Sequence, residues 1–197
     1  MLDNESVWLA RAQKGDMEAF SLLVEAYQKP VYNLCYRMLG EAGEAEDAAQ
    51  ETFLRAFKAM KYYDSSRPFP TWLLSIAAHY CIDQIRKRRM TVVSMEELPN
   101  LDLPDHAPGP ESAMSKREEQ RRVHALLENL SPTDRAAVVM YYWYDYSYDE
   151  IAQSLSLSLS AVKSRLHRAR KELALNWQEE QVRSPFSERR KNESPAL

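Results

Sequence analysis

The stretch from Ser147 to Lys171 constrains the fold most, because it contains two short helical patterns joined by a tight, serine-rich turn. Ser147 and Glu150 have the spacing of a capping box, which predicts that the first helix begins there. Ser158 follows the turn and can cap the second helix. The apolar residues of that second helix fall on one side at helical spacing: Val162, Leu166, Ala169 and Leu173. This pattern predicts a helix-turn-helix, whose second helix enters the major groove of DNA.

The opposite side of the second helix carries hydroxyl, imidazole and basic groups. These residues are Ser160, Lys163, Ser164, His167, Arg168 and Lys171. The mixture suits DNA, because some of these groups read base edges and others hold phosphates. Small residues also lie where the two helices must cross closely: Ala152, Ser156 and Ala161. The alternative interpretation is an ordinary helical hairpin with a solvated basic face.

The overall charge limits the ways in which this chain can bind DNA. The formal net charge of the 197 residues is -3. A protein that coats DNA without regard to sequence needs a surplus of Lys and Arg to neutralise phosphates. An acidic total therefore argues against nonspecific coating, and the segregation of charge along the chain matters more than the total.

The cysteine content and the hydropathy pattern predict the compartment. Cys35 and Cys81 have no metal-like spacing and lie among apolar residues, so we expect two buried thiols. No apolar run is long enough to span a bilayer, and charged residues interrupt the start of the chain, so no signal peptide is expected. These features predict a cytoplasmic protein without direct membrane insertion.

Only four glycines and no alternating strand pattern occur, so the predicted fold class is all-α. Residues 4–13 form a short amphipathic pattern, and its expected inward side chains are Val7, Trp8 and Ala12. Gly15 should break this helix, and Asp16 can cap the next one. Pro30 lies within the following apolar repeat, where a kink or a restart is expected, and Gly40 ends that repeat.

A predicted helix over residues 44–60 carries an acidic surface. Asp47, Gln50, Glu51 and Leu54 share one face, at spacings of i, i+3, i+4 and i+7. Leu54 is an apolar residue within this acidic face. The pattern alone fits two interpretations equally: a solvated face with one stray leucine, or a docking site for a basic partner.

Residues 61–70 form a predicted loop with three aromatic side chains, which are Tyr62, Tyr63 and Phe69. They could stack unpaired bases or cap the core, and for a lone loop the core interpretation is favoured. The next predicted helix, residues 71–89, is almost enclosed by apolar residues except for one stripe. That stripe consists of Trp72, Ser75, His79, Asp83 and Arg86.

Four consecutive cations, Arg86 to Arg89, end this helix. They exceed what the helix dipole needs, so a phosphate partner is the better interpretation, with Arg88 and Arg89 among the contacts. No His, Cys or carboxylate arrangement around His79 suggests a metal, and none elsewhere suggests a cofactor.

The region after this helix marks a domain boundary. Between Thr91 and Ser115 there is no Lys or Arg, whereas prolines and carboxylates are frequent. We therefore expect two small helical domains, residues 1–92 and 116–177, joined by a flexible acidic linker over residues 93–115. Within the second domain, Ser131 and Pro132 predict a helix start. Residues 178–197 are polar and are expected to form a disordered tail.

The order of these motifs resembles an extracytoplasmic-function (ECF) sigma factor of bacterial RNA polymerase. The resemblance runs from about Leu9 to Trp177. Its strongest segments are Gly15–Phe20, Ala45–Phe57, Thr71–Ala77 and Tyr148–Leu173. It implies a sigma-2-like domain at residues 1–92 and a sigma-4-like helix-turn-helix domain at residues 116–177. It also implies a DNA-binding subunit without catalysis of its own.

The resemblance also implies roles for the residues identified above. The helix around Asp47 and Leu54 is similar to the segment that binds the clamp helices of the largest polymerase subunit. The loop before Trp72 and the stripe that follows are similar to the elements that melt the −10 DNA and capture a flipped base. Residues implied to face the −35 element are Lys163, Ser164, His167 and Arg168, and those implied to hold phosphates are Arg165, Arg170 and Lys171. The polymerase flap, promoter DNA and an anti-sigma factor are the further partners that the family implies.

The sequence departs from the family pattern at three positions. His79 stands where many relatives carry Asn, Ser156 replaces a frequent turn glycine, and His167 has no fixed counterpart. A competing hypothesis is a free-standing helix-turn-helix regulator with a ligand-sensing N-terminal domain. It would leave the acidic face and the basic run unexplained. An enzyme lacks support, because no nucleophile and base, metal spacing or glycine-rich phosphate loop is present.

Overall fold

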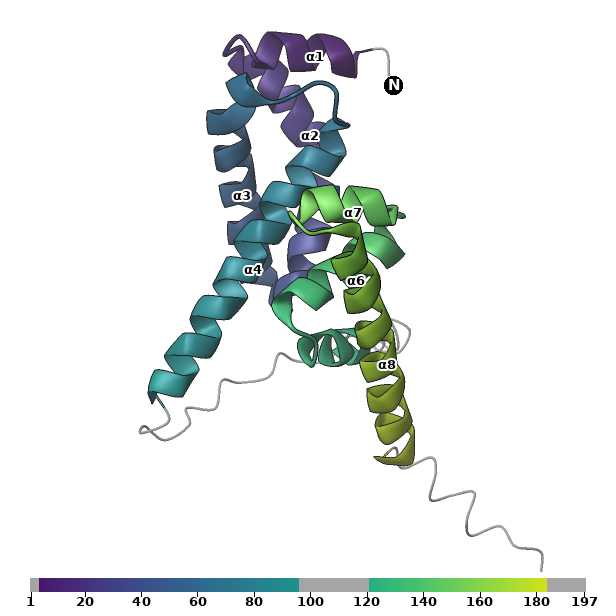
Figure 1. The fold of residues 1–197 in the computed structure, drawn as a ribbon. Helices are drawn as coiled ribbons and strands as arrows, with labels where there is room; N and C mark the ends of the chain where they lie inside the picture. The colour runs from purple at the N-terminus through teal and green to yellow at the C-terminus, as the bar shows by residue number, and fades with distance from the viewer. Residues whose placement is uncertain (1–3, 96–120, 184–197) are drawn as a thin grey trace, which may run out of the picture.

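The protein was analysed as a computed structural model, which describes residues 4–95 and 121–183. All regular elements within these two ranges are helices, which confirms the predicted all-α class (Figure 1). In chain order they are α1 Glu5–Ala12, α2 Met17–Leu39, α3 Ala42–Ala59, the short 3-10 helix η1 Met60–Tyr62, α4 Phe69–Met95, a helical segment at residues 121–128, α6 Pro132–Trp143, α7 Tyr148–Ser154 and α8 Leu159–Arg183.

Helices α2, α3 and α4 pack against one another and form the N-terminal part. Asp16 caps α2 as predicted, since its carboxylate accepts hydrogen bonds from the amides of Glu18 and Ala19. Gly40 ends α2 with a φ of 87°, a left-handed conformation that favours glycine. The restart expected at Pro30 is wrong, because α2 is one helix that contains this proline.

The prediction for α1 is partly wrong. Ala12 is buried and Trp8 is partly buried, but Val7 is 53% exposed. Leu9 packs on the core instead. Helix α1 packs against α2, which covers only one narrow side of α1. Val7 does not lie on that covered side. The outcome illustrates that an eight-residue helix gives too few repeats to define its buried side from sequence.

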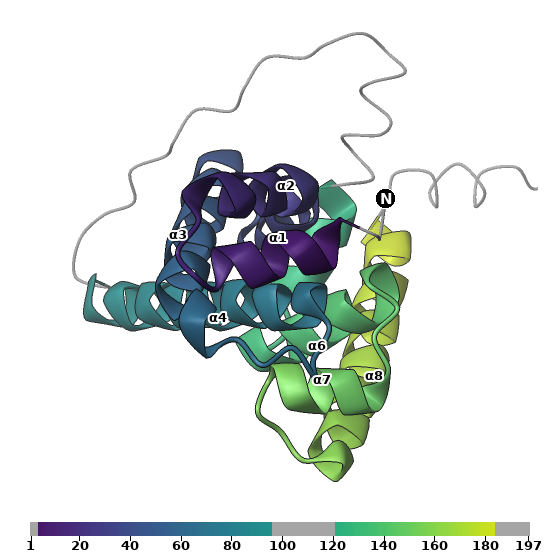
Figure 2. The ribbon, with the colours of Figure 1, turned by 90° about the horizontal axis from the view of Figure 1, so that it is seen from above.

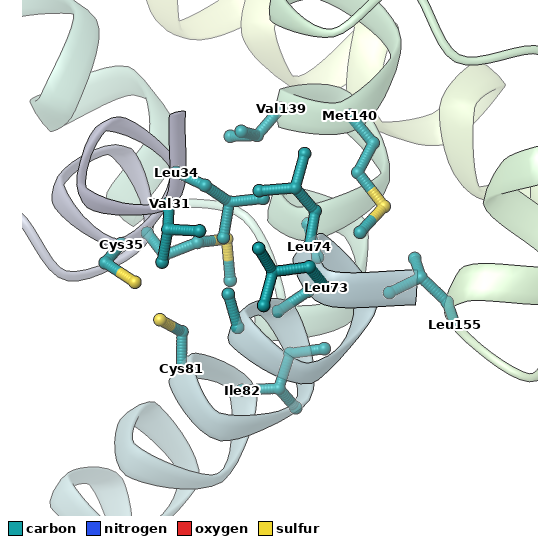
Figure 3. Close-up of a cluster of buried hydrophobic side chains, with 14 of the residues drawn as sticks. Val31, Leu34, Cys35, Leu73, Leu74, Cys81, Ile82, Val139, Met140 and Leu155 are labelled. Atoms are coloured by element: carbon teal, nitrogen blue, oxygen red, sulfur yellow. The ribbon is translucent and has the colours of Figure 1, made fainter. Parts of the chain in front are cut away.

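The two cysteines are free and buried, as predicted. Cys35 lies in α2 and Cys81 in α4, and their sulfur atoms point toward each other (Figure 3). A hydrogen bond with the Cys35 thiol, together with burial, raises the pKa of the Cys81 thiol. The two thiols therefore serve as core side chains between these helices.

Two helices extend past the predicted segment boundaries. Helix α4 continues to Met95, beyond the expected linker start at residue 93, and α8 continues to Arg183, into the expected tail. In both places the sequence has no proline or glycine that would stop a helix before those ends. The remainder of the predicted linker and of the tail lies outside the described residues.

The C-terminal part contains the predicted helix-turn-helix. Ser131 caps α6, with Pro132 at its first position, and Ser147 and Glu150 form both bonds of the predicted capping box at α7. Ser156 turns the chain between α7 and α8 with a φ of 54°. The hydroxyl of Ser158 then accepts a hydrogen bond from the Ala161 amide at the start of α8. This part therefore follows the sequence pattern closely.

The two parts lie directly against each other. Helix α6 contacts α2 and α4, and α7 contacts α4. In both views α3 and α7 lie on different sides of α4, which is therefore covered by both parts of the chain (Figures 1 and 2). This arrangement explains why the sequence of α4 is apolar around most of its circumference.

Candidate nucleic-acid and protein interfaces

The acidic face, which we define as Asp47, Gln50, Glu51 and Leu54, lies on the outer side of α3. Leu54 is 55% exposed, and Asp47 and Gln50 are exposed beside it. Glu51 is partly engaged, because its carboxylate pairs with the Arg55 guanidinium at 2.7 Å. The opposite side of α3 is buried through small residues, Ala45, Ala48, Ala49, Thr52 and Ala56. The structure therefore brings together all four predicted docking residues at the surface.

Two grooves between α2 and α3 adjoin the acidic face, and sequence analysis missed them. One has a volume of about 440 Å³ and is lined by apolar residues that include Met17, Phe57 and Leu54 itself. The other has a volume of about 480 Å³ and lies beside Lys29 and Tyr32. Phe57 lies three residues after Leu54, so both side chains fall on the same side of the helix. This spacing was the sequence signal that could have indicated an apolar surface next to the acidic face. A partner on the acidic face would also contact this apolar surface.

The predicted polar stripe of α4 is present, but two of its side chains bond to carbonyl oxygens of the same helix. The Ser75 hydroxyl donates to the Trp72 carbonyl at 2.7 Å, and His79 Nδ1 lies 2.8 Å from the Ser75 carbonyl oxygen. His79 and Asp83 are exposed. Asp83 lies 3.9 Å from the Arg86 guanidinium, a loose pair on the helix surface. The exposed edge of the His79 ring is therefore available to a ligand.

Trp72 differs from the rest of that stripe, because it is partly buried against aromatic neighbours. Its ring lies 5.0 Å from that of Tyr63 and 5.6 Å from that of Phe69. Tyr63 and Phe69 are themselves buried, so the core interpretation of the loop is confirmed for these two. It is wrong for Tyr62, which is 76% exposed beside the Lys61 ammonium group. Tyr62 is thus a solvent-facing aromatic residue at the end of η1.

The basic run that ends the stripe is engaged with the rest of the chain. Arg88 pairs with Glu44 of α3. Arg89 donates to the Leu130 carbonyl at 3.2 Å, and Arg86 lies 3.5 Å from the Thr133 hydroxyl. Both of these contacts reach the C-terminal part. These contacts occupy only part of the hydrogen-bonding capacity of Arg86, Arg88 and Arg89, since each guanidinium has five N–H donors.

The predicted reading face of α8 is open. Ser160, Lys163, Ser164, His167, Arg168 and Lys171 are all exposed. Val162, Leu166 and Ala169 are buried on the other side, as the apolar spacing predicted. The helix therefore presents its polar side chains together on one surface.

Arg165 does not belong to that open surface. Its guanidinium donates to Asp134 of α6 at 2.8 Å, and both side chains are largely buried. Asp134 also accepts a hydrogen bond from the Ser131 hydroxyl at 2.7 Å. This ion pair ties α8 to the start of α6, and the phosphate contact of Arg165 stays a prediction.

Arg170 is exposed but held by tyrosines. It donates to the Tyr142 hydroxyl at 3.0 Å and to the Tyr148 hydroxyl at 3.4 Å, and it lies over the Tyr141 ring. The hydrogen bond to Tyr148 is the main cause that raises the pKa of Arg170, and the same contact lowers the pKa of Tyr148. Arg170 therefore stays cationic in a fixed position at the edge of the reading face.

A third groove, of about 460 Å³, lies on the C-terminal part. It is almost entirely apolar, and Leu126, Trp143 and Trp177 are among its lining residues. Trp143 is 39% exposed here, and its ring also contacts the Arg37 guanidinium. The groove is an apolar surface of the C-terminal part, and its lining residues are not those of the reading face.

Among residues 4–95 and 121–183, no group of three or more His, Cys, Asp or Glu side chains is arranged to hold a metal ion. None of the helices in those ranges has the length and apolar character needed to cross a membrane.

The fold and its surfaces define an all-helical transcription protein with a helix-turn-helix domain. Residues 23–91 match the family model for sigma-70 region 2, and residues 120–173 match the model for sigma-70 region 4. The chain is 34% identical to the ECF RNA polymerase sigma factor SigW of Bacillus subtilis, over 84% of this chain and 92% of that protein. It is 32% identical to the ECF RNA polymerase sigma-E factor of Escherichia coli K12, over 84% and 90%. The chain belongs to the ECF sigma factor family, as its motifs predicted.

A solved structure agrees with this assignment. CnrH, in complex with the cytosolic domain of CnrY, is 26% identical, covers 88% of this chain and 96% of its own, and superposes with a TM-score of 0.67. The chain is thus an alternative sigma factor, which directs promoter-specific initiation of transcription by RNA polymerase.

Proposed function

We propose that the acidic face binds the clamp helices of the polymerase, that the α4 stripe opens and reads the −10 element, and that α8 reads the −35 element. The observation that carries the proposal is the open reading face of α8, whose six polar side chains lie together opposite the buried apolar side. A recognition helix needs this separation, since one side must pack while the other reaches base edges.

Within the reading face, Lys163 lies in the second turn of α8, where an inserted helix presents its base readers. Exchanging Lys163 for Ala should cost about 1–3 kcal/mol at particular −35 positions and relax specificity there. Lys171→Ala is the matched control, because this lysine lies two turns further along and is assigned to a phosphate. The Lys171→Ala change should weaken binding to all −35 sequences alike. The measurement is binding of the holoenzyme to a library of −35 DNA variants. If Lys163→Ala leaves the affinity ranking of these variants unchanged, this side chain contacts the DNA backbone and does not read bases.

His79 is proposed to contact a base of the −10 element. The motivating observation is its exposed ring, which the Ser75 carbonyl holds at one nitrogen. His79→Ala should lower transcription from the native promoter about tenfold and alter the −10 base preference, the effect of losing one base contact. His79→Asn keeps a polar side chain of similar reach and should retain more activity. The measurement is transcription from −10 variants, and an Ala variant with full activity and the same preference would make His79 structural.

The remaining partners follow from the apolar surfaces. We assign the C-terminal groove with Trp143 and Trp177 to the polymerase flap. An anti-sigma factor is proposed because the related CnrH is bound by the cytosolic domain of CnrY. We also propose that the protein acts in the cytoplasm together with RNA polymerase and has no catalytic step of its own. Pull-down of the tagged chain with core polymerase tests the polymerase contact among these assignments.

A further inference from the structure

The turn between α6 and α7 is rich in tyrosine and has a strained backbone. Tyr141 and Tyr142 lie in the last turn of α6, and Tyr148 is the first residue of α7. Between them, Asp145 has a φ of 52°, a left-handed conformation that is unfavourable for a residue with a side chain. Helix α7 has only seven residues, so it is too short to be stable by itself. The position of α7 therefore depends on contacts with its neighbours.

One side chain of α8 contacts both sides of this turn. Arg170 donates from Nε to the Tyr142 hydroxyl at 3.0 Å, and from a terminal nitrogen to the Tyr148 hydroxyl at 3.4 Å. Its guanidinium carbon also lies 5.2 Å from the centre of the Tyr141 ring. A guanidinium has several donors in a fixed planar geometry, so one side chain can bind two hydroxyls and one ring at once. Arg170 thus connects the end of α6, the start of α7 and α8.

The two ends of α7 are held in different ways. Ile151, in the middle of the helix, is fully buried. At the start of the helix, Ser147 and Asp149 on either side of Tyr148 are exposed. The contact between Tyr148 and Arg170 therefore ties the start of α7 to α8. In a helix-turn-helix the first helix crosses the DNA backbone while the second lies in the major groove, so DNA binding needs a fixed angle between them.

We propose that Arg170 is a positioning residue for −35 recognition, which holds the turn between α6 and α7 and the start of α7 against α8. The inference rests on the proposed function of α8 as the reader of the −35 element. It differs from a phosphate contact in what it requires of the side chain. Positioning requires the planar guanidinium, which reaches two hydroxyls, whereas a phosphate contact requires mainly a positive charge. Both tyrosine hydroxyls then contribute to DNA affinity through Arg170.

The first test exchanges Arg170 for Lys, which keeps the charge and loses the planar donors. Binding of the holoenzyme to a promoter duplex with its −35 element is measured. Arg170→Lys and Arg170→Ala should both bind about tenfold more weakly, the effect of losing hydrogen bonds to a charged group. Lys171, the next residue, provides the matched control, because it is assigned to a phosphate. Lys171→Arg should keep the affinity, and only Lys171→Ala should lower it.

The second test removes the two acceptors. Tyr142→Phe combined with Tyr148→Phe keeps both rings and leaves Arg170 in place. This double variant should bind the promoter as weakly as Arg170→Lys, and it should cause no further loss in a chain that already carries Arg170→Lys. Tyr27→Phe is the control, since Tyr27 donates to Glu5 in the N-terminal part, and its promoter affinity should not change.

The titration of Tyr148 checks the contact without DNA. The hydrogen bond from Arg170 lowers the pKa of the Tyr148 hydroxyl, so NMR titration should show a higher pKa for Tyr148 in Arg170→Ala than in the wild-type chain. Urea denaturation should show equal stability of wild type and Arg170→Lys, because the exchanged side chain is exposed.

Three results would overturn the proposal. They are an unchanged Tyr148 pKa in Arg170→Ala, wild-type promoter affinity of Arg170→Lys or of the tyrosine double variant, and a loss of stability in Arg170→Lys as large as its loss of affinity. If the wild-type holoenzyme shows no preference among −35 sequences, the assignment of α8 fails and the positioning role fails with it. A clear −35 preference in wild type together with full affinity of Arg170→Lys overturns the positioning role alone.

Discussion

Replacing Asp47 by Arg together with Leu54 by Ala is expected to abolish co-purification with core RNA polymerase. The first change reverses a charge on the acidic face, and the second removes an apolar side chain that is 55% exposed and lines the groove between α2 and α3. Central residues of an interface each cost about 2 kcal/mol or more when truncated, and a reversed charge adds repulsion. The combined loss is therefore expected to exceed about 100-fold in affinity. The measurement is pull-down of core enzyme with the tagged chain.

A matched control for this variant exists on the same part of the protein. Glu25 is exposed on α2, and Val7 of α1 is 53% exposed, so Glu25→Arg with Val7→Ala changes charge and apolar surface equally at another place. The control should retain polymerase. Circular dichroism of both proteins should show the same helical content, because none of the four residues is buried. Retained binding by the folded Asp47 and Leu54 variant would refute the docking assignment.

Replacing Leu166 by Ala is expected to destabilise the chain by about 2–5 kcal/mol, the usual cost of such a change at a buried site. Leu166 is fully buried in α8, opposite the reading face. Its loss leaves a cavity beneath the recognition helix, so binding to −35 DNA should fall as well. Leu175→Ala is the control, since this leucine of the same helix is 53% exposed and should change stability by less than about 0.5 kcal/mol. Urea denaturation of both variants measures the difference, and equal stability of the two would contradict the packing described for α8.

Local chemistry made much of the fold predictable. The caps at Asp16, Ser131 and Ser147 depend on side chains within three residues of the amides that they bind, so the sequence alone contains both partners. The apolar spacing of α8 depends on the helical repeat, and all of Val162, Leu166 and Ala169 are buried as expected. The exposure of the acidic face and of the reading face followed from the same periodicity.

Contacts between distant residues were beyond such reasoning. Arg165 and Asp134 are 31 positions apart, and Arg135 and Met38 are 97 apart, so no spacing rule connects them. The sequence pattern therefore identified the basic side chain on α8 but not its partner in α6. The packing of the two parts against each other was missed for the same reason, because linker composition describes the connection and not the surfaces that it connects.

The ion pair between Arg165 and Asp134 has a consequence for the thermodynamics of binding. Asp134 accepts hydrogen bonds from both Ser131 and Arg165, so the start of α6 and the second turn of α8 are fixed to one carboxylate. The orientation of the recognition helix is therefore set when the domain folds, and its conformational entropy is lost at that step. Binding to DNA then requires little further ordering of this helix, which leaves more of the contact energy to favour association.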